Sequence, residues 1–407
     1  MISVAEAISK ITQSFTALPS ETISLENGLG RVICDDLIAR RTQPPFSVSA
    51  MDGFAVKASD IKNIPQSLLI IGSVPAGTKL DDKLEEGQAV RIFTGARIPE
   101  GADSVIIQEN TELSPNKKNV IIKAIPQTGD FIRNAGLDFT EGETLIKAGT
   151  RLNARSLGLV AAMNIPWINV VQLPRVAILS NGDEIVLPGE RIGENQIVSS
   201  NGVALSAAIK SFGALPIQIG IAKDTTDSLY KSIEKALSFD LLVTTGGASV
   251  GDHDLVKKVL EKLGLDLEFW KIAMRPGKPL MFGSIENTNV IGLPGNPVSA
   301  LICAQIFIKP AIEKMLGSKY IHSKDYIQAK LTLDLPKNDE REDYLRGIYS
   351  VSESGQIQVN VFKKQDSSMG SLLAKANCLV IRKPNAPAIA AGKFVTILRL
   401  PNSWESI

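Results

Sequence analysis

The stretch from Phe239 to Leu260 constrains the fold of this chain more than any other, because a short apolar strand leads through a glycine turn into a helix. Residues 241–243 form an uninterrupted apolar run, which is typical of a strand buried on both faces of a parallel sheet. Beyond the turn, apolar residues recur at helical spacing from position 255 to 263. The pattern predicts a helix whose N-terminus faces the loop.

The loop itself has the composition of an anion site. Gly246, Gly247 and Gly251 permit positive φ and let a ligand approach main-chain N–H groups closely. An isolated GG turn is also typical of a tight connection without a ligand. Here Ser249, Asp252 and Asp254 add a hydroxyl and two carboxylate groups, and these favour phosphate. The glycine spacing fits neither the dinucleotide fingerprint nor the P-loop.

Composition excludes several classes of protein. The chain has 407 residues, 44% hydrophobic and 21% charged, which predicts a soluble protein of roughly two to four domains. A formal net charge of +1 argues against broad capture of nucleic acid or of an anionic membrane surface. No apolar segment approaches the roughly 20 residues of a membrane span, and the N-terminus does not resemble a signal peptide. We expect a cytoplasmic protein.

Cysteine and histidine are too few for several chemistries. Cys34, Cys303 and Cys378 are isolated and odd in number, which predicts small buried residues instead of a disulfide framework or a CxxC site. His253 and His322 are the only histidines, so histidine-ligated metals and triad hydrolysis are disfavoured. Acid, base or metal chemistry must rest mainly on carboxylates, lysines and backbone.

Strand and helix signals divide the chain into four regions. Residues 175–325 alternate strands and helices, which predicts a doubly wound α/β sandwich. Residues 44–138 read as an irregular β domain and residues 326–407 as a small β barrel or sandwich. Residues 1–43 and 139–174 carry helical signals and form one discontinuous linker domain. In the α/β region we expect strands at 175–180, 215–222, 240–245, 267–273 and 289–294, and helices at 202–212, 225–237, 254–263 and 298–316.

Three residues mark helix boundaries in the α/β region. Thr225 or Thr226 is a suitable N-cap for the second helix, and Gly264 is a suitable C-cap for the third. Pro310 falls inside the last helix and is expected to kink it or divide it in two.

A second loop of unusual shape follows another apolar strand, in the sequence GLPGNPVSA at 292–300. Prolines and a glycine fix its course, and Asn296 and Ser299 place polar groups at a helix N-terminus. The alternative is a structural proline turn. Because the carboxyl ends of parallel strands share one edge of a sheet, this loop is expected to face the TTGG turn across a crevice.

Three further segments carry charged groups. Asp183 and Glu184 follow the strand RVAILS and suit Mg²⁺ beside phosphate oxygens, although such a pair is also typical of a solvated turn. Three cations lie between 271 and 278 around a Pro-Gly bend, which favours an oxyanion site over a plain surface loop. Asp52 stands in the apolar run SAMDGFAV, where it is either functional or part of an Asx turn.

Taken in order, SAMDGFAV, RIFTGARIPEGADSVIIQE, the GDE after RVAILS, TTGGASVGDHD, RPGKP and LPGNPVSA resemble the molybdopterin molybdotransferases, the molybdenum insertases that include the E domain of gephyrin. The resemblance covers essentially the whole chain and is weakest in the last 80 residues. It implies that residues 175–325 form an α/β domain of the molybdopterin-binding type.

The resemblance also implies an activity. Members of the family take adenylylated molybdopterin and molybdate and yield molybdenum cofactor and AMP with the help of Mg²⁺. They are homodimers whose active cleft lies between the α/β domain of one subunit and the first two domains of the other. Implied partners are the molybdopterin adenylyltransferase and proteins that deliver cofactor to molybdoenzymes, without nucleic acid or membrane.

Site residues follow by motif. The implied catalytic groups are Asp52, Thr94, Asp138, Glu184, Asp254, Lys271 and Arg275. The implied metal ligands are Asp52, Glu184 and Asp254. The backbone reading and the resemblance together assign pterin and phosphate binding to Gly246, Gly247, Ser249, Gly251, Pro294, Gly295, Asn296, Pro297 and Ser299. Molybdate handling is assigned to Arg275, Lys278, Pro279, Arg346, Ser367 and Ser368.

Three positions depart from the family pattern. Arg275 stands where members usually carry Lys, Asn134 where many carry a second Arg, and Asn181 where Thr is common. None of these changes removes a carboxylate. Two other functions remain open: a pterin-binding scaffold without catalysis, and the adenylyltransferase whose domain resembles the α/β region. The retained carboxylates favour catalysis, and the extra β domains with RPGKP favour insertion.

Overall fold

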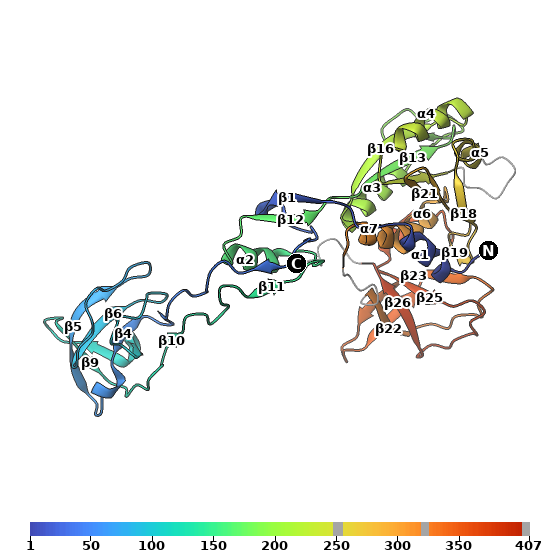
Figure 1. Ribbon diagram of the computed structural model, residues 1–407. Coiled ribbons are helices and arrows are strands. Elements are labelled where there is room, and N and C mark those ends of the chain that lie inside the picture. Colours follow the sequence, from blue (N-terminus) through green and yellow to red (C-terminus); the bar gives the residue numbers. More distant parts are fainter. Residues whose placement is uncertain (247–254, 319–324, 401–407) are drawn as a thin grey trace. The chain divides into compact units, whose positions relative to one another are not determined.

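The computed structural model describes residues 1–246, 255–318 and 325–400. The chain forms two compact units, whose elements are labelled in Figure 1. The larger unit consists of Met1–Asp35, Ala148–Arg155 and Ile168–Ile407, and the smaller unit of Asp36–Lys147 and Ser156–Trp167. The larger unit contains an α/β part and a C-terminal barrel, each built on its own sheet.

The smaller unit is built on a mixed six-stranded sheet in the order β7-β4-β6-β5-β9-β8. Alternate residues of its strands feed two apolar clusters, one with Phe54 and Val56 and the other with Ala55 and Val90. The β-type runs of the sequence correspond to these strands. Their bounds are β4 Gly53–Val56, β5 Gln66–Val74, β6 Gln88–Ile92, β7 Ser104–Ile107, β8 Thr111–Leu113 and β9 Asn119–Ile122.

Three short pairs of strands are formed by residues that precede and follow this sheet in the sequence. They are β1 (Ser20–Ser24) with β12 (Trp167–Val171), β2 (Leu37–Ile38) with β11 (Thr144–Ile146), and β3 (Val48–Ser49) with β10 (Ile132–Arg133). The helical signal in SLGLVAAMN corresponds to α2 (Ala154–Ala162).

The α/β part carries the sheet order β16-β13-β17-β21-β20-β18. The first four strands run parallel, and β20 and β18 are joined by antiparallel pairings. Four strands match their predicted bounds within a residue, the predicted strand at 267–273 ends at Trp270, and β20 was not predicted from the sequence. Bounds are β13 Arg175–Asn181, β16 Leu215–Ala222, β17 Leu241–Thr245, β18 Asp266–Trp270, β20 Met281–Ile285 and β21 Thr288–Leu293.

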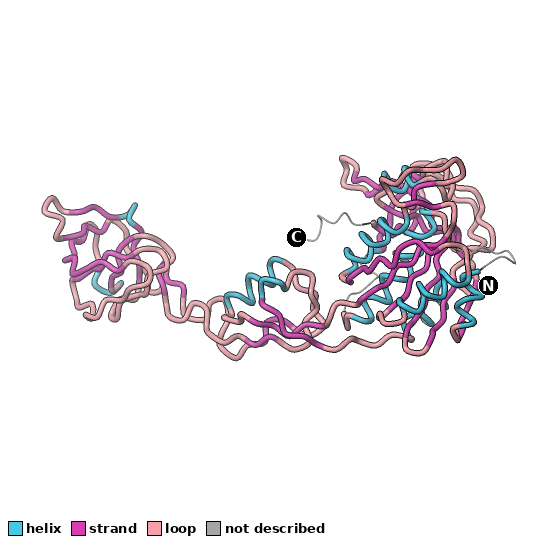
Figure 2. The backbone as a smooth tube through the Cα atoms, turned by 90° about the horizontal axis from the view of Figure 1, so that it is seen from above, coloured by secondary structure: helices cyan, strands magenta, loops and turns pink. Residues whose placement is uncertain are grey.

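Helices cover both faces of this sheet (Figure 2). One face packs against α1 (Val4–Gln13), α3 (Asn201–Phe212), α6 (Pro297–Cys303) and α7 (Lys309–Met315), and the other against α4 (Thr226–Ala236) and α5 (Leu255–Lys262). Neighbouring residues of β17 divide between the faces, because Leu241 and Val243 join the first cluster and Leu242 the second. The doubly wound sandwich predicted from the sequence is therefore present.

Helix boundaries follow the expected residues. Thr225 caps α4 by accepting a hydrogen bond from the N–H of Ser228, and Gly264 after α5 has a φ of +88°. The helix that contains Pro310 divides into α6 and α7, with a π-helical turn at Ala304–Ile308 between them. Proline lacks the N–H that an α-helix needs, so a change of hydrogen-bond pattern just before it is the expected response. Over the described ranges, no helix combines the length and apolarity that a membrane crossing requires.

The C-terminal barrel closes through pairings of β23 with both β24 and β25. Its strands are β22 Tyr326–Leu331, β23 Glu342–Val351, β24 Ile357–Val361, β25 Cys378–Arg382 and β26 Phe394–Arg399, with α8 at Gly370–Lys375. The short strand β19 (Met274–Arg275) leaves the α/β part and pairs in parallel with the start of β23. This pairing fixes the barrel against the α/β part.

Candidate functional site

Strand register brings five separate segments to one edge of the α/β sheet. The last residue of β17, Thr245, pairs with Leu293 at the end of β21, and Ser180 near the end of β13 pairs with Thr245. Because β20 runs antiparallel, its first residue Met281 lies opposite Gly292, near the end of β21. The segments after β13, β16, β17 and β21 and the segment between β18 and β20 therefore share this edge, as ligand loops of doubly wound sheets do.

Two loops come into contact at this edge. They are the TTGG turn, which begins at Thr244, and the loop in GLPGNPVSA at 292–300, the proline loop. A Cβ placed on Gly295 would lie only 3.6 Å from the Cα of Gly246, and the Thr245 hydroxyl is 3.5 Å from the carbonyl oxygen of Pro294. Gly246 has a φ of +93°, and a side chain there would meet the backbone oxygen of Asn181 at 2.6 Å. Only glycine fits this position.

The proline loop ends in the first turn of α6. Asn296 occupies the N-cap position with extended backbone angles, and Pro297 follows at the first helical position, where its missing N–H costs nothing. Ser299 is buried within this turn. The N–H of Val298 donates to the backbone oxygen of Ser367, in the barrel, at 3.2 Å, so residues from both sheets form this side of the site.

Carboxylates gather after β13 and β16. The N–H of Asp183 donates to the Asp224 carboxylate at 3.3 Å, and the N–H of Asp224 donates to the Asp183 carboxylate at 3.2 Å. The Glu184 carboxylate folds over Gly182, where a Cβ would meet it at 2.4 Å. The buried Oδ1 of Asn181 has no hydrogen-bond partner in the described chain. Sequence reasoning missed Asp224, although it lies just beyond the predicted strand LPIQIGIA.

The segment between β18 and β20 presents two lysines. Lys271 has a φ of +73°, and its Nζ lies 4.3 Å from the centre of the Trp270 ring. Lys257 of α5 places its Nζ 4.2 Å from the same ring, so one indole attracts two ammonium groups. Lys278 is exposed, and Pro279 is half-buried beside it. Gly277 has a φ of +118° and packs against the Cys303 sulfur, which makes glycine necessary in this bend.

Arg275 belongs to an ion cluster of the barrel. Its guanidinium donates to Asp339 at 3.0 Å and to Asn338 at 3.2 Å, and it pairs with the buried carboxylate of Asp343. Hydrogen bonds from Arg341, with a contribution from the charge of Arg275, lower the pKa of Asp339 to about 2. The charge of Arg275 is thus already balanced by carboxylates.

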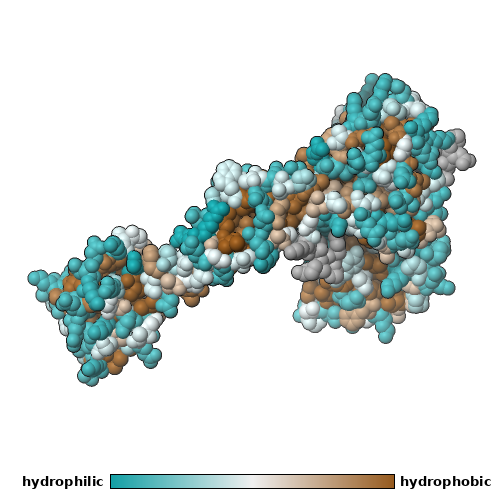
Figure 3. All heavy atoms as spheres, viewed as in Figure 1, coloured by the Kyte–Doolittle hydropathy of each residue, from teal (hydrophilic) through white to brown (hydrophobic). Residues whose placement is uncertain are grey.

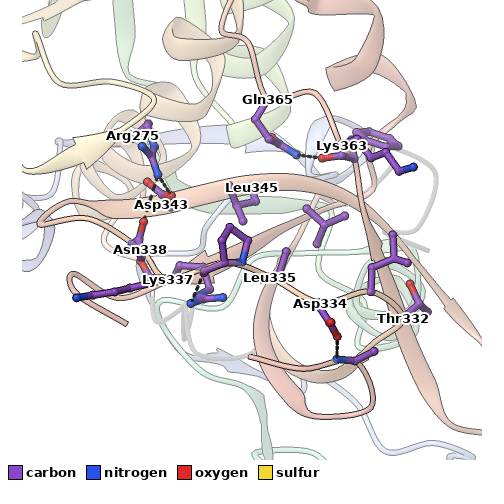
Figure 4. Close-up of a pocket in the computed structure, with 16 residues that line it drawn as sticks. Arg275, Thr332, Asp334, Leu335, Lys337, Asn338, Asp343, Leu345, Lys363 and Gln365 are labelled. Atoms are coloured by element: carbon purple, nitrogen blue, oxygen red, sulfur yellow. Dashed lines mark hydrogen bonds and ion pairs between the residues drawn. The ribbon is translucent and has the colours of Figure 1, made fainter. Parts of the chain in front are cut away.

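A cavity of about 870 Å³ adjoins this cluster (Figure 4). Arg275, Asn338 and Asp343 lie together at one side of it, and Leu335 and Leu345 contribute apolar wall. The other described residues that line the cavity belong to the barrel, and Arg275 is the one that comes from the segment between β18 and β20.

The remaining predicted molybdate residues lie in the barrel, and Ser367 contacts the proline loop. Arg346 is 1% exposed, and its Nε donates to Gln365 at 3.1 Å. Burial lowers the pKa of Arg346, and its Nη2 is a buried donor without an acceptor among the described residues. Ser367 contacts Asn296 and Val298, whereas the hydroxyl of Ser368 donates to Asp366.

Asp52 and Thr94 form a pair within the smaller unit. The N–H and the hydroxyl of Thr94 each donate to the Asp52 carboxylate at 2.8 Å, and these bonds lower the pKa of Asp52. Gly95, with a φ of +80°, turns the chain at Thr94, while Gly53 lets strand β4 approach the Ile106 carbonyl oxygen, which a Cβ would meet at 1.9 Å. The glycines of SAMDG and RIFTG thus position the pair. Asp138 is exposed in the same unit.

Four predicted residues, Gly247, Ser249, Gly251 and Asp254, lie outside the described residues. The cysteine predictions agree with the structure for Cys303 and Cys378, which are buried, and burial raises the pKa of Cys378 to about 12. Cys34 is half-buried. None of the three forms a disulfide.

The carboxylates after β13 and β16 suit a hard cation, because Mg²⁺ prefers oxygen ligands and retains several waters or phosphate oxygens. In the described part of the chain, however, no three His, Cys, Asp or Glu side chains converge to hold a metal ion. The donor set therefore fits Mg²⁺ only where a substrate supplies further oxygens.

Three family profiles match this chain. They are described as "MoeA N-terminal region (domain I and II)" over residues 2–164, "Probable molybdopterin binding domain" over residues 177–314, and "MoeA C-terminal region (domain IV)" over residues 328–400.

Individual proteins are similar over nearly the whole length. The molybdopterin molybdenumtransferase of Haemophilus influenzae is 35% identical over 400 residues, which cover 98% of each chain. The Bacillus subtilis protein of the same name is 33% identical over 98% of this chain and 94% of its own. A solved structure, the molybdopterin biosynthesis MoeA protein from Pyrococcus horikoshii, shares 32% identity with a TM-score of 0.81, covering 99% of this chain and 100% of that one.

Proposed function

Because this chain belongs to the family of molybdopterin molybdenumtransferases, we propose that it transfers molybdenum from molybdate to adenylylated molybdopterin and releases AMP. One observation carries the proposal: the TTGG turn and the proline loop meet at the edge of the sheet where parallel strands end. Backbone N–H groups at such an edge suit a phosphate, and adenylylated molybdopterin contains a pyrophosphate-type link.

The pterin and its phosphates are assigned to the two loops. A ligand can approach the backbone closely at Gly246, at Gly295 and at the first turn of α6. The predicted binding residues Gly247, Ser249 and Gly251 follow Gly246 in the sequence. A helix N-terminus favours a negative group by its free N–H donors and its dipole. Asn296, Pro297 and Ser299 fix the position of that terminus.

Molybdate requires compensation of its charge, because it is a dianion that must approach another anion. Lys271 and Lys278 lie at the same edge, and Lys278 is exposed. Arg346 and Ser367 approach from the barrel, where Arg346 holds one donor without a described acceptor. Arg275 contributes least to this proposal because Asp339 and Asp343 already occupy its guanidinium.

Carboxylates complete the proposed chemistry. Glu184, with Asp52 and Asp254 from the other motifs, would hold Mg²⁺, and the ion would screen the phosphate charge when bound. Asp224 joins this group through its reciprocal bonds with Asp183. The protein then acts by positioning and charge stabilisation, and no side-chain nucleophile is required.

A homodimer is part of the same proposal, as is a cytoplasmic location. Large apolar side chains are exposed along one stretch of the larger unit, including Leu187, Ile192, Ile197 and Val203. Brown, apolar surface is visible on both units in Figure 3. Exposed large apolar side chains are a feature of association surfaces. Sedimentation equilibrium tests this part, and a monomer at micromolar concentration would contradict it.

The decisive assay mixes purified protein with adenylylated molybdopterin, molybdate and Mg²⁺ and measures AMP. Release of AMP that depends on molybdate, with formation of active cofactor, supports the proposal. Binding of the pterin without AMP release indicates the scaffold alternative. Consumption of ATP in the absence of molybdate indicates the adenylyltransferase alternative.

A further inference from the structure

One side chain bridges the two loops of the proposed pterin site. Asn201, the first residue of α3, donates from Nδ2 to the hydroxyl of Thr245 at 2.8 Å and to the backbone oxygen of Gly295 at 2.6 Å. Thr245 immediately precedes Gly246 in the TTGG turn, and Gly295 lies in the proline loop. A single amide nitrogen therefore connects segments that are 44 and 94 residues away in the chain.

The orientation of this amide follows from its partners. A backbone carbonyl oxygen can only accept, so the atom 2.6 Å from the Gly295 oxygen must be the nitrogen of Asn201. The two bonds are short, whereas the direct contact between the loops, from the Thr245 hydroxyl to the Pro294 oxygen, is 3.5 Å. Asn201 is thus the stronger connection between them.

The helix that carries Asn201 is itself firmly held. Leu205 and Ile209 of α3 are fully buried, and the side-chain amide of Gln218 donates to the Gly202 oxygen and to the Ser206 hydroxyl, both at 2.6 Å. Asn201 therefore projects from a packed helix toward the end of β17 at Thr245 and toward Gly295 of the proline loop.

Local sequence preferences argue for the same role. Asn and Ser at the start of a helix usually cap its free N–H groups, but Ser200 makes no side-chain cap bond here, and the Asn201 amide is directed to the loops. Where a residue departs from its local preference, a requirement elsewhere in the structure is the common cause.

We propose that Asn201 is a positioning residue that sets the spacing of the TTGG turn and the proline loop, and thereby the affinity for the pterin substrate. This inference rests on the proposed function, because the ligand it serves is the one assigned above. Without the amide, the distance between the backbone groups of the two loops is no longer fixed. A phosphate between the loops then loses some of its hydrogen bonds to those groups.

The test compares Asn201→Ala and Asn201→Asp with wild type and with Gln218→Ala. Gln218→Ala removes hydrogen bonds from the same helix without touching either loop, so it controls for general loosening of α3. Each protein is titrated with molybdopterin, and steady-state kinetics are measured against adenylylated molybdopterin and against molybdate. Thermal unfolding of each variant verifies that it is folded.

Asn201→Ala is expected to weaken molybdopterin binding and to raise KM for the adenylylated substrate by about tenfold or more, the size of one or two lost hydrogen bonds. Asn201→Asp is expected to weaken molybdopterin binding further, because the carboxylate and the Gly295 oxygen repel each other. KM for molybdate and the values for Gln218→Ala are expected to stay within about twofold of wild type.

Two outcomes separate the inference from the proposed function. If wild type and both Asn201 variants bind molybdopterin equally, the positioning role is wrong even where turnover is normal. If wild type binds molybdopterin, the variants bind it weakly, and no protein releases AMP, the positioning role stands and the proposed reaction fails. Wild type that does not bind molybdopterin contradicts both.

Discussion

The side-chain amide of Asn296 donates a hydrogen bond of 2.8 Å to the hydroxyl of Ser367, and so joins the proline loop of the α/β part to the C-terminal barrel. The same segment of the barrel accepts from the N–H of Val298. The barrel is therefore a wall of the site, and residues that the sequence places about 70 positions apart act together.

Ser367→Ala is expected to lower turnover several-fold and to cost about 1 kcal/mol of stability, because Asn296 loses its acceptor while the backbone bond to Val298 remains. The matched control is Ser352→Ala, a serine of the barrel whose hydroxyl bonds to that of Ser354. AMP release and chemical denaturation measure the two effects. If both variants release AMP at the same rate and are equally stable, the contact with Asn296 does not contribute to turnover.

Thr94→Val is expected to raise the pKa of Asp52, because the hydroxyl that bonds to the carboxylate is removed while the backbone N–H bond remains. These bonds lower the pKa, so their stabilising effect is present above the unfolded-state pKa and is lost as pH falls through the folded-state value. The acid limb of the pH–rate profile should move to higher pH.

Carbon-13 NMR of the Asp52 carboxyl group measures this shift directly. Thr94→Ser keeps the hydroxyl and serves as the control. An unchanged pKa in Thr94→Val would mean that the backbone bond alone holds the carboxylate ionised.

Glu184→Ala is expected to reduce AMP release by about a hundredfold or more while leaving molybdopterin affinity near that of wild type, since the carboxylate is assigned to charge stabilisation and not to pterin contact. Glu194→Ala, an exposed carboxylate in the same connection, is the control. Titration with Mg²⁺ adds a second readout. Undiminished turnover in Glu184→Ala would remove this residue from the mechanism.

Arg275→Ala is expected to destabilise the larger unit by about 2 kcal/mol, because the buried Asp343 loses its partner; the half-exposed guanidinium keeps the cost below that of a fully buried pair. Arg275→Lys is expected to be intermediate, since one ammonium cannot bond Asp339, Asp343 and Asn338 at once. Thermal unfolding measures both. A loss of molybdate affinity without a loss of stability would assign Arg275 to the anion instead.

The α/β architecture was largely predictable because its signals are local. The strands at 175–181, 215–222 and 241–245 coincide with apolar runs, and Thr225 and Gly264 mark helix ends by their own chemistry. Strand β20 was missed because Gly283 interrupts its pattern. That glycine is required by a close approach to the Asp266 oxygen, which a Cβ would meet at 2.4 Å, and the sequence does not reveal the neighbour.

The site was predictable where motifs carry backbone geometry, and not where it depends on long-range partners. Gly246 and Gly295 are glycines in loop motifs, which indicate that another backbone or a ligand comes close to them. Asn201 and Asp224 are single polar residues whose partners lie more than 40 positions away in the sequence. The sequence around Arg275 predicts an anion-binding group, but in the structure Asp339 and Asp343 of the barrel already pair with it. Charge in the sequence does not say whether a group is already neutralised.

Strands β20 and β21 are the two legs of a single hairpin, which Glu286 and Asn287 close at one end. The segment with Lys271 and Lys278 enters the hairpin at its open end, and the proline loop leaves it there. Five residue pairs, from Met281–Gly292 to Ile285–Thr288, fix the register of the two strands. Deleting one residue from either leg would shift that leg by about 3.3 Å and invert its side chains. The exposed tip tolerates insertion far better, so a fluorescent label can be introduced there without disturbing the register of β20 and β21.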